Sequence, residues 1–176
     1  FGNPDLKPET STNYELGFNL QPNDQINFTA TGFYNQIEDA IVSNDLSGQL
    51  ICPVTNCSQD INAQEAKVYG AETTLQYSII PEWDIKAAYT YTKSEITDGE
   101  DEGLYYNNNP RNAFNLTSTW HVNPALDIWL QHEYKSSRTR FSSIPTSGDN
   151  LEVYKMYGNK FAGYNLFNLG TSYTVN

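Results

Sequence analysis

The chain has 176 residues, a formal net charge of −11 and an aromatic content of 14%, including thirteen Tyr. The acidic balance argues against nucleic acid as a partner, because phosphate binding needs a basic surface. Apolar residues rarely come more than two together, so no stretch reaches the roughly 18 residues that a membrane-spanning helix needs.

Seven segments are apolar at every second position, which is the pattern of a β-strand with one apolar and one polar face. In chain order, the expected strands span about 10–20, 25–35, 67–79, 83–92, 114–121, 126–135 and 167–175. In the first strand, for example, Tyr14 and Leu16 flank Glu15. In the sixth strand, Trp129 falls among the polar positions and departs from the pattern.

The connections between these segments are sorted by length. Three are tight turns, at 21–24, 80–82 and 123–125, and the connections at the other ends are long and polar, at about 44–65, 96–109 and 142–160. Short turns at one end and long loops at the other are typical of a transmembrane β-barrel. A soluble sandwich has no reason to sort its loops in this way.

The aromatic residues of the apolar positions form two bands. Near the tight turns lie Phe18, Phe28, Tyr77, Trp83, Trp120 and Tyr173, and toward the long loops lie Tyr14, Tyr34, Tyr69, Tyr91, Phe114 and Tyr134. The positions between the bands are mostly aliphatic or small, as at Leu75 and Leu130. Two aromatic bands around an aliphatic belt predict the interfacial girdles of a membrane barrel, although large aromatics also fill the core of a sandwich. We therefore expect an all-β fold, an antiparallel segment of a transmembrane β-barrel.

Seven strands cannot close a bacterial single-chain barrel, and an open sheet of this kind exposes two edges. The chain is therefore expected to be a piece of a larger barrel. Cys52 and Cys57 are the only cysteines, and their spacing in the first long loop predicts a local disulfide in an oxidising compartment, with two free thiols as the alternative. No His or further Cys lies near them, so no metal site is indicated.

The run from Gly2 to Ser11, followed by Asn13 to Gly17, resembles a recurring stretch of TonB-dependent outer-membrane receptors. Two later pieces, 68–72 and 109–116, are similar to strand openings of the same family. The resemblance covers the chain. It implies that residues 1–176 are part of a 22-stranded barrel in the bacterial outer membrane, with the long loops extracellular. About two strands would follow residue 176, and the plug domain and TonB box are not in this sequence.

Physical roles follow for some of these residues. Pro4 and Pro8 are expected to hold the approach to the first strand extended, because proline lacks a backbone donor and restricts its neighbour. Gly70 leaves space on the polar face, which in this family faces the plug. Glu72 lies on the same face as Gly70, and it either pairs with a basic residue of the plug or is a solvated lumen carboxylate.

The resemblance implies a receptor that imports ferric siderophores, with the catecholate group as the nearest subclass, energised through TonB. Such complexes are anionic, so the mouth should present basic and aromatic groups. The candidate ligand contacts are Arg111, Arg138, Arg140, Tyr105 and Tyr106, with Lys135 and Tyr134 nearby. The basic residues have an alternative role, in which they offset acids or lipopolysaccharide phosphates beside the outer-membrane lipid.

No arrangement of Ser, His and Asp and no phosphate-binding loop is present, so we expect no enzyme and no cofactor other than the transported ligand. His121 and His132 are expected on opposite faces of separate strands. The rival hypotheses are a receptor of the same architecture for cobalamin, haem or an oligosaccharide, and a soluble adhesin or lectin-like module.

Overall fold

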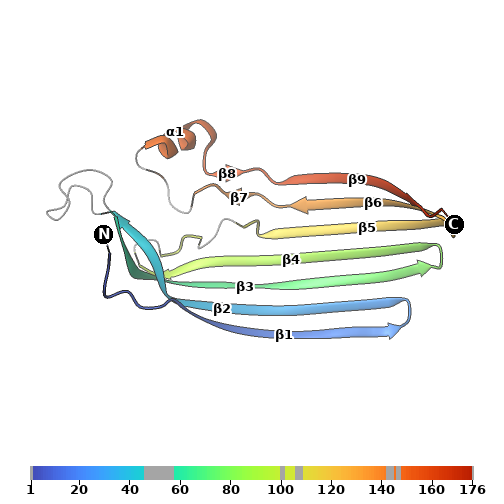
Figure 1. Cartoon of the computed structure of the whole chain (residues 1–176), viewed down its shortest axis with the longest axis horizontal. Helices are drawn as coiled ribbons and strands as arrows, with labels where there is room; N and C mark the ends of the chain where they lie inside the picture. Colours follow the sequence, from blue (N-terminus) through green and yellow to red (C-terminus); the bar gives the residue numbers. More distant parts are fainter. Residues whose placement is uncertain are drawn as a thin grey trace. The chain divides into compact units, whose positions relative to one another are not determined.

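The computed structural model describes residues 2–45, 58–99, 102–105, 109–141, 145 and 148–175 (Figure 1). The strands are β1 (Thr10–Asn23), β2 (Ile26–Asp45), β3 (Ser58–Ile80), β4 (Trp83–Asp98), β5 (Asn112–Asn123), β6 (Leu126–Lys135), β7 (Arg138–Thr139), β8 (Lys160–Phe161) and β9 (Tyr164–Tyr173). A single helix, α1, spans Gly148–Tyr157 in the part of the chain described. In the described part of the chain, no helix is long and apolar enough to cross a membrane.

The seven expected strands form one sheet with the order β1-β2-β3-β4-β5-β6-β9. The pairs β4–β5, β5–β6 and β6–β9 are antiparallel. Each strand therefore pairs with the next long strand along the chain, whether a tight turn or a long connection joins the two, since antiparallel neighbours allow both. The prediction of an all-β antiparallel sheet is confirmed, and this fragment leaves β1 and β9 at the two edges.

The long connections are more structured than the sequence pattern indicates. β2 reaches Asp45, β3 begins at Ser58 and β4 reaches Asp98, so part of each expected loop is strand. Strict alternation breaks down in these extensions, and the backbone of Asp39 has a positive φ of 56°. The period-two pattern therefore stops before the strands do, since an irregular backbone shifts side chains between faces.

The last long connection holds two further elements. α1 is short and polar and none of its residues is buried, so it gives no apolar periodicity to detect (orange in Figure 1). β7 and β8 have two residues each and pair with each other, Arg138 opposite Phe161 and Thr139 opposite Lys160. The expected loop at 142–160 is therefore wrong in its detail, since it contains a helix and the first residue of β8.

Two compact units are present. The first comprises 1–14, 34–68 and 94–107, and the second 15–33, 69–93 and 108–176. The first unit contains a small core in which Ile37, Ala40 and Ala66 are buried and Val68 packs against them. This core forms beyond the alternating part of the strands, where both polar and apolar residues depart from the period of two.

Within the first unit, the segment 2–9 is attached to β3 by side-chain amides. The Asn3 side chain donates to the Asp60 carbonyl at 2.9 Å, and the Gln59 side chain donates to the Gly2 carbonyl at 3.1 Å. Side-chain amides carry both a donor and an acceptor, so they can replace a backbone ladder where two segments lie out of register. The segment that resembles the family motif is thus an ordered strap, a name used below for residues 2–9.

Asn62 contacts the centre of this strap. Its Oδ1 accepts from the Lys7 amide at 2.8 Å, and its Nδ2 donates to the Lys7 carbonyl at 2.9 Å and to the Asp39 carbonyl at 2.7 Å. One side chain therefore satisfies both polar groups of a single residue of the strap, as a neighbouring strand would.

Backbone geometry in the strap differs in one respect from the expectation. The chain turns at Pro4 and Asp5, where the Leu6 amide donates to the Asn3 carbonyl at 3.5 Å and the Asp5 amide donates to Asn3 Oδ1 at 3.0 Å. The extended approach expected from Pro4 is therefore wrong at this residue, because a fixed φ also suits the second position of a turn. Pro8 lies after the turn, in the run that leads to β1.

Asn62→Ala in the intact protein is expected to loosen the strap, because three hydrogen bonds are lost at one point. Amide hydrogen exchange in the peptide that covers residues 2–9 should become about tenfold faster. Asn35→Ala is the matched control, since the side chain of Asn35 accepts a 2.7 Å bond from Ser11, which lies outside residues 2–9. Equal acceleration in both variants would contradict a local role for Asn62.

In the second unit, strand register places the apolar side chains on one face. Trp83 lies opposite Trp120, and Phe114 lies opposite Tyr134, so each expected aromatic band continues across neighbouring strands. Large apolar side chains on this face stay exposed, with Trp120 at 56% and Leu130 at 47% of full exposure. A soluble sandwich buries its apolar face, whereas a membrane barrel turns it to lipid, and the exposure favours the barrel.

Two glycines of the second unit lie where a neighbouring group occupies the Cβ position. A Cβ at Gly70 would overlap the Tyr91 carbonyl oxygen and lie 2.8 Å from Cζ of Phe33. A Cβ at Gly170 would overlap the indole ring of Trp129. The space beside Gly70 is therefore occupied by the Tyr91 carbonyl and the Phe33 ring, which come from the neighbouring strands. Trp129 lies on the polar face because Gly170 leaves room for its ring.

Candidate functional site

On the polar face of β4, β5, β6 and β9, hydrogen-bonded side chains form rows that cross from strand to strand. These rows succeed one another from the tight-turn end of the sheet to the long-loop end. At the tight-turn end, His121 Nε2 lies 2.9 Å from Asp84 Oδ2, and His121 Nδ1 lies 2.7 Å from Asp127 Oδ1. Ser172 donates to the second oxygen of Asp127 at 3.4 Å. An imidazolium satisfies both carboxylates, since it donates through both nitrogens, so this row joins four strands through charge-assisted contacts.

The next rows are neutral. Trp129 covers Gly170, and beyond it the Gln131 amide donates to Asn115 at 3.4 Å while the Asn168 amide donates to Gln131 at 3.1 Å. An amide ladder of this kind lets neighbouring strands share donors and acceptors and leaves further groups for water or a polypeptide on the open side.

At the loop end, two side chains meet around one carboxylate. Lys135 Nζ lies 3.0 Å from Glu133 Oε1, and the Tyr164 hydroxyl donates to the same oxygen at 3.0 Å. Lys135 Nζ also lies 5.9 Å from the centre of the Tyr164 ring, within the range of a cation–π contact. Lys135 is opposite Tyr164 in the β6–β9 register, so the pairing of these strands builds the cluster.

The two-stranded sheet of β7 and β8 adds Arg138 and Phe161, and Arg140 follows β7 directly. The guanidinium carbon of Arg138 lies 4.9 Å from the centre of the Phe161 ring, and that of Arg140 lies 3.9 Å from the same centre. Arg140 also lies 5.6 Å from the ring of Tyr157, at the end of α1. Contact with a ring face stabilises a guanidinium without using its N–H donors, and in Arg138 these donors stay available to an anion.

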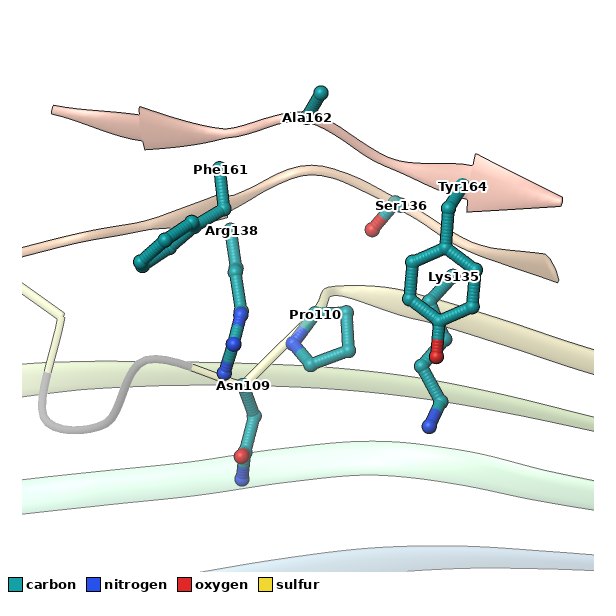
Figure 2. A pocket seen from close by; sticks show the side chains of 8 residues that line it. All are labelled: Asn109, Pro110, Lys135, Ser136, Arg138, Phe161, Ala162 and Tyr164. Carbon is teal, nitrogen blue, oxygen red and sulfur yellow. The ribbon is translucent and has the colours of Figure 1, made fainter. Parts of the chain in front are cut away.

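A cavity of about 480 Å³ lies between these two groups of side chains. Figure 2 shows its lining: Asn109, Pro110, Lys135, Ser136, Arg138, Phe161, Ala162 and Tyr164. The Arg138 side chain extends along the Phe161 ring toward Asn109, and Lys135 and Tyr164 lie together on the other side of Pro110. Its volume is within the range of about 300–1,000 Å³ typical of small-molecule sites.

The chemistry of this lining suits an anionic or aromatic ligand group. Arg138 supplies a planar fork of donors, Phe161 and Tyr164 supply ring surface, and Asn109 supplies an amide that donates and accepts. Among the described residues, no cluster of His, Cys, Asp and Glu has the geometry of a metal site.

Of the sequence-predicted ligand residues, the structure brings Arg138 and Arg140 together on Phe161, and Lys135 lines the same cavity as Arg138. Arg111 is exposed at the start of β5 and is not part of the cavity lining, although the Thr92 amide donates to its carbonyl at 3.0 Å. The ligand role of these residues stays a prediction.

The remaining predicted residues lie elsewhere. Tyr105 is 38% exposed and belongs to the first compact unit, whereas the cavity belongs to the second. Tyr106, Cys52 and Cys57 lie outside the described residues, so the ligand role and the disulfide stay predictions. Glu72 is exposed in β3, and no described residue forms an ion pair with it.

Sequence reasoning missed Phe161, Tyr164, Glu133 and Asn109 as parts of this site. The available signal was weak, because 160–164 lies far along the chain from 133–138, and only strand pairing brings them together. Asn109 and Pro110 stood within the family-like run 109–116, which could have drawn attention to them.

The whole chain, residues 1–176, matches the TonB-dependent receptor-like β-barrel family, and the chain belongs to that family. The iron-regulated outer membrane virulence protein of Vibrio cholerae is 32% identical over 146 residues, which cover 77% of this chain and 22% of that protein. The ferric-pyoverdine receptor PbuA of a Pseudomonas species is 24% identical over 176 residues, which cover 97% of this chain and 20% of the receptor. The chain thus spans about a fifth of the length of these relatives.

Solved structures show the same fold. The ferric enterobactin receptor PfeA of Pseudomonas aeruginosa superposes with a TM-score of 0.72 at 21% identity, covering 97% of this chain and 24% of the receptor. The ferric-catecholate import receptor Fiu of E. coli superposes with a TM-score of 0.69 at 21% identity, covering 99% of this chain and 22% of the receptor. The sheet is thus a section of an outer-membrane barrel wall, which confirms the fold and the location expected from the sequence.

Proposed function

We propose that the intact protein is an outer-membrane receptor that imports a ferric siderophore complex, energised through TonB. The observation that carries this proposal is the cavity at the loop end of the polar face, where Arg138 lies on Phe161 and Lys135 lies beside Tyr164. A large anionic iron complex needs positive charge and ring surface together, and this cavity offers both. The related ferric-pyoverdine receptor and the structurally similar ferric-catecholate and ferric-enterobactin receptors support the same substrate class.

Import by such a receptor also needs a plug domain, a contact with TonB and a closed barrel. The plug domain, the TonB contact and the remaining strands of a 22-stranded barrel belong to the rest of the protein. On the polar face, Glu72 is a candidate partner for a basic residue of the plug. The protein itself performs no covalent chemistry in this mechanism: the loops capture the complex, and the plug rearranges to let it pass.

Growth on single iron sources tests the proposal. A strain without the gene should lose growth and radiolabelled iron uptake with one ferric siderophore as the sole iron source, and the intact gene should restore both. Removal of TonB should abolish the same uptake. Loss of cobalamin or haem uptake, with every ferric siderophore still used, would contradict the proposed substrate class.

A further inference from the structure

A carboxylate lies at the edge of a cavity whose other side chains suit an anion. Glu133 Oε1 accepts from both Lys135 and Tyr164, each at 3.0 Å. The side chains of Glu133 and Lys135 are 27% and 42% exposed, so the pair is only partly open to solvent. A negative charge in this position would repel a polyanionic ligand.

Glu133 changes which positive charge the cavity presents. The Lys135 ammonium is engaged by the carboxylate, and the two charges largely offset each other at a distance. Arg138, by contrast, rests on the Phe161 ring, and no carboxylate among the described residues forms an ion pair with it. Arg138 is therefore the lining residue whose charge acts on a ligand, while Lys135 contributes less than its own charge suggests.

We propose that Glu133 is a specificity-determining residue, which limits the preference of this cavity for polyanionic ferric complexes over neutral ones of similar size. The inference rests on the proposed function and goes beyond it, because it assigns the charge preference to one side chain. A ferric tris-catecholate complex is a trianion, whereas a ferric tris-hydroxamate complex is neutral. The two classes therefore respond differently when one charge beside the lining is added or removed.

Glu133→Gln tests the proposal with little change of shape. Glutamine keeps the oxygen that accepts from Tyr164 and Lys135, but it removes the negative charge. In the full-length receptor, the affinity for a ferric tris-catecholate should rise by roughly threefold to tenfold. The affinity for a ferric tris-hydroxamate should change by less than about twofold, because a neutral ligand gains no Coulomb energy.

Two further variants separate charge from structure. Glu133→Asp keeps the charge and should retain the wild-type ratio of the two affinities. Glu152→Gln is the matched control, since Glu152 lies 2.8 Å from Lys155 in α1, and Lys155, unlike Lys135, is not part of the cavity lining; it should leave both affinities unchanged. The gain of Glu133→Gln should shrink as salt is raised, which a purely structural effect would not do.

The outcomes are distinct. A parallel change for both ferric probes in Glu133→Gln, or a gain of equal size in Glu152→Gln, would overturn the role of Glu133 while leaving the proposed function intact. If the wild-type receptor binds neither probe, the charge preference is overturned, whereas the proposed function is decided separately by growth and uptake on single iron sources. A rise for the trianion alone, lost at high salt, supports the inference.

Discussion

Gly70→Ala is expected to destabilise the intact receptor by about 3 kcal/mol or more, at the upper end of what overpacking costs. The added Cβ would overlap the backbone carbonyl of Tyr91 and lie 2.8 Å from the ring of Phe33. A backbone atom cannot rotate away as a side chain can, so β3 and its neighbour must separate or the ring of Phe33 must leave its position. Both changes weaken the hydrogen-bonded ladder of the barrel wall.

The measurement is the denaturant midpoint of the purified receptor in detergent, followed by the electrophoretic shift between folded and unfolded barrel. Gly32→Ala is the matched control, because a Cβ at Gly32 has its nearest neighbour, the Leu16 carbonyl, at 3.9 Å. It tests the loss of glycine from a strand without a collision. If both variants keep the wild-type midpoint, the close approach at Gly70 does not exist in the folded receptor.

Arg138→Gln is expected to reduce the affinity of the intact receptor for an anionic ferric siderophore by about tenfold to a hundredfold. Arg138 carries a charge that no described carboxylate offsets, and its contact with Phe161, 4.9 Å from the ring centre, holds the guanidinium at the cavity. Glutamine keeps two donors but loses the charge and the planar fork. The effect should be largest at low salt and should fall as ionic strength rises.

Equilibrium binding of the ferric complex, followed by quenching of intrinsic fluorescence, checks this result. Lys155→Gln is the control, since it removes one positive charge from α1, where Lys155 pairs with Glu152 outside the cavity lining. Its affinity should stay within about twofold of the wild type. An equal loss in the two variants would show that net charge, and not the cavity, governs binding.

Most of the fold followed from the alternation of residues. A period of two indicates which residues share a face, and the contrast between Leu16 and Glu15 in β1 is enough to show it. The pattern failed in the extensions of β2 and β3, where a buried cluster of Ile37, Ala40 and Ala66 replaces the two-faced strand. It failed again at α1, because a short polar helix without buried residues has no apolar period.

The candidate site was predicted only in part. Arg138 and Arg140 were both predicted from the sequence as candidate ligand contacts. Their shared ring, Phe161, could not be predicted, because it comes from another strand more than 20 residues away along the chain. The prediction of His121 and His132 on opposite faces is confirmed: His121 lies between Asp84 and Asp127, and His132 stacks on Phe167 at 4.5 Å.

The sequence by itself determined the strands, their two faces, the sorting of turns and loops, and the family through the run from Gly2 to Ser11. The tertiary structure alone decided which side chains meet, such as Glu133 with Tyr164 and Gly170 with Trp129. The physical reason is that a period of two fixes the side of the sheet on which a residue lies but not its partner on the next strand. That partner depends on register, which turns, bulges and packing set over the whole sheet, and the cavity at the loop end is a product of register.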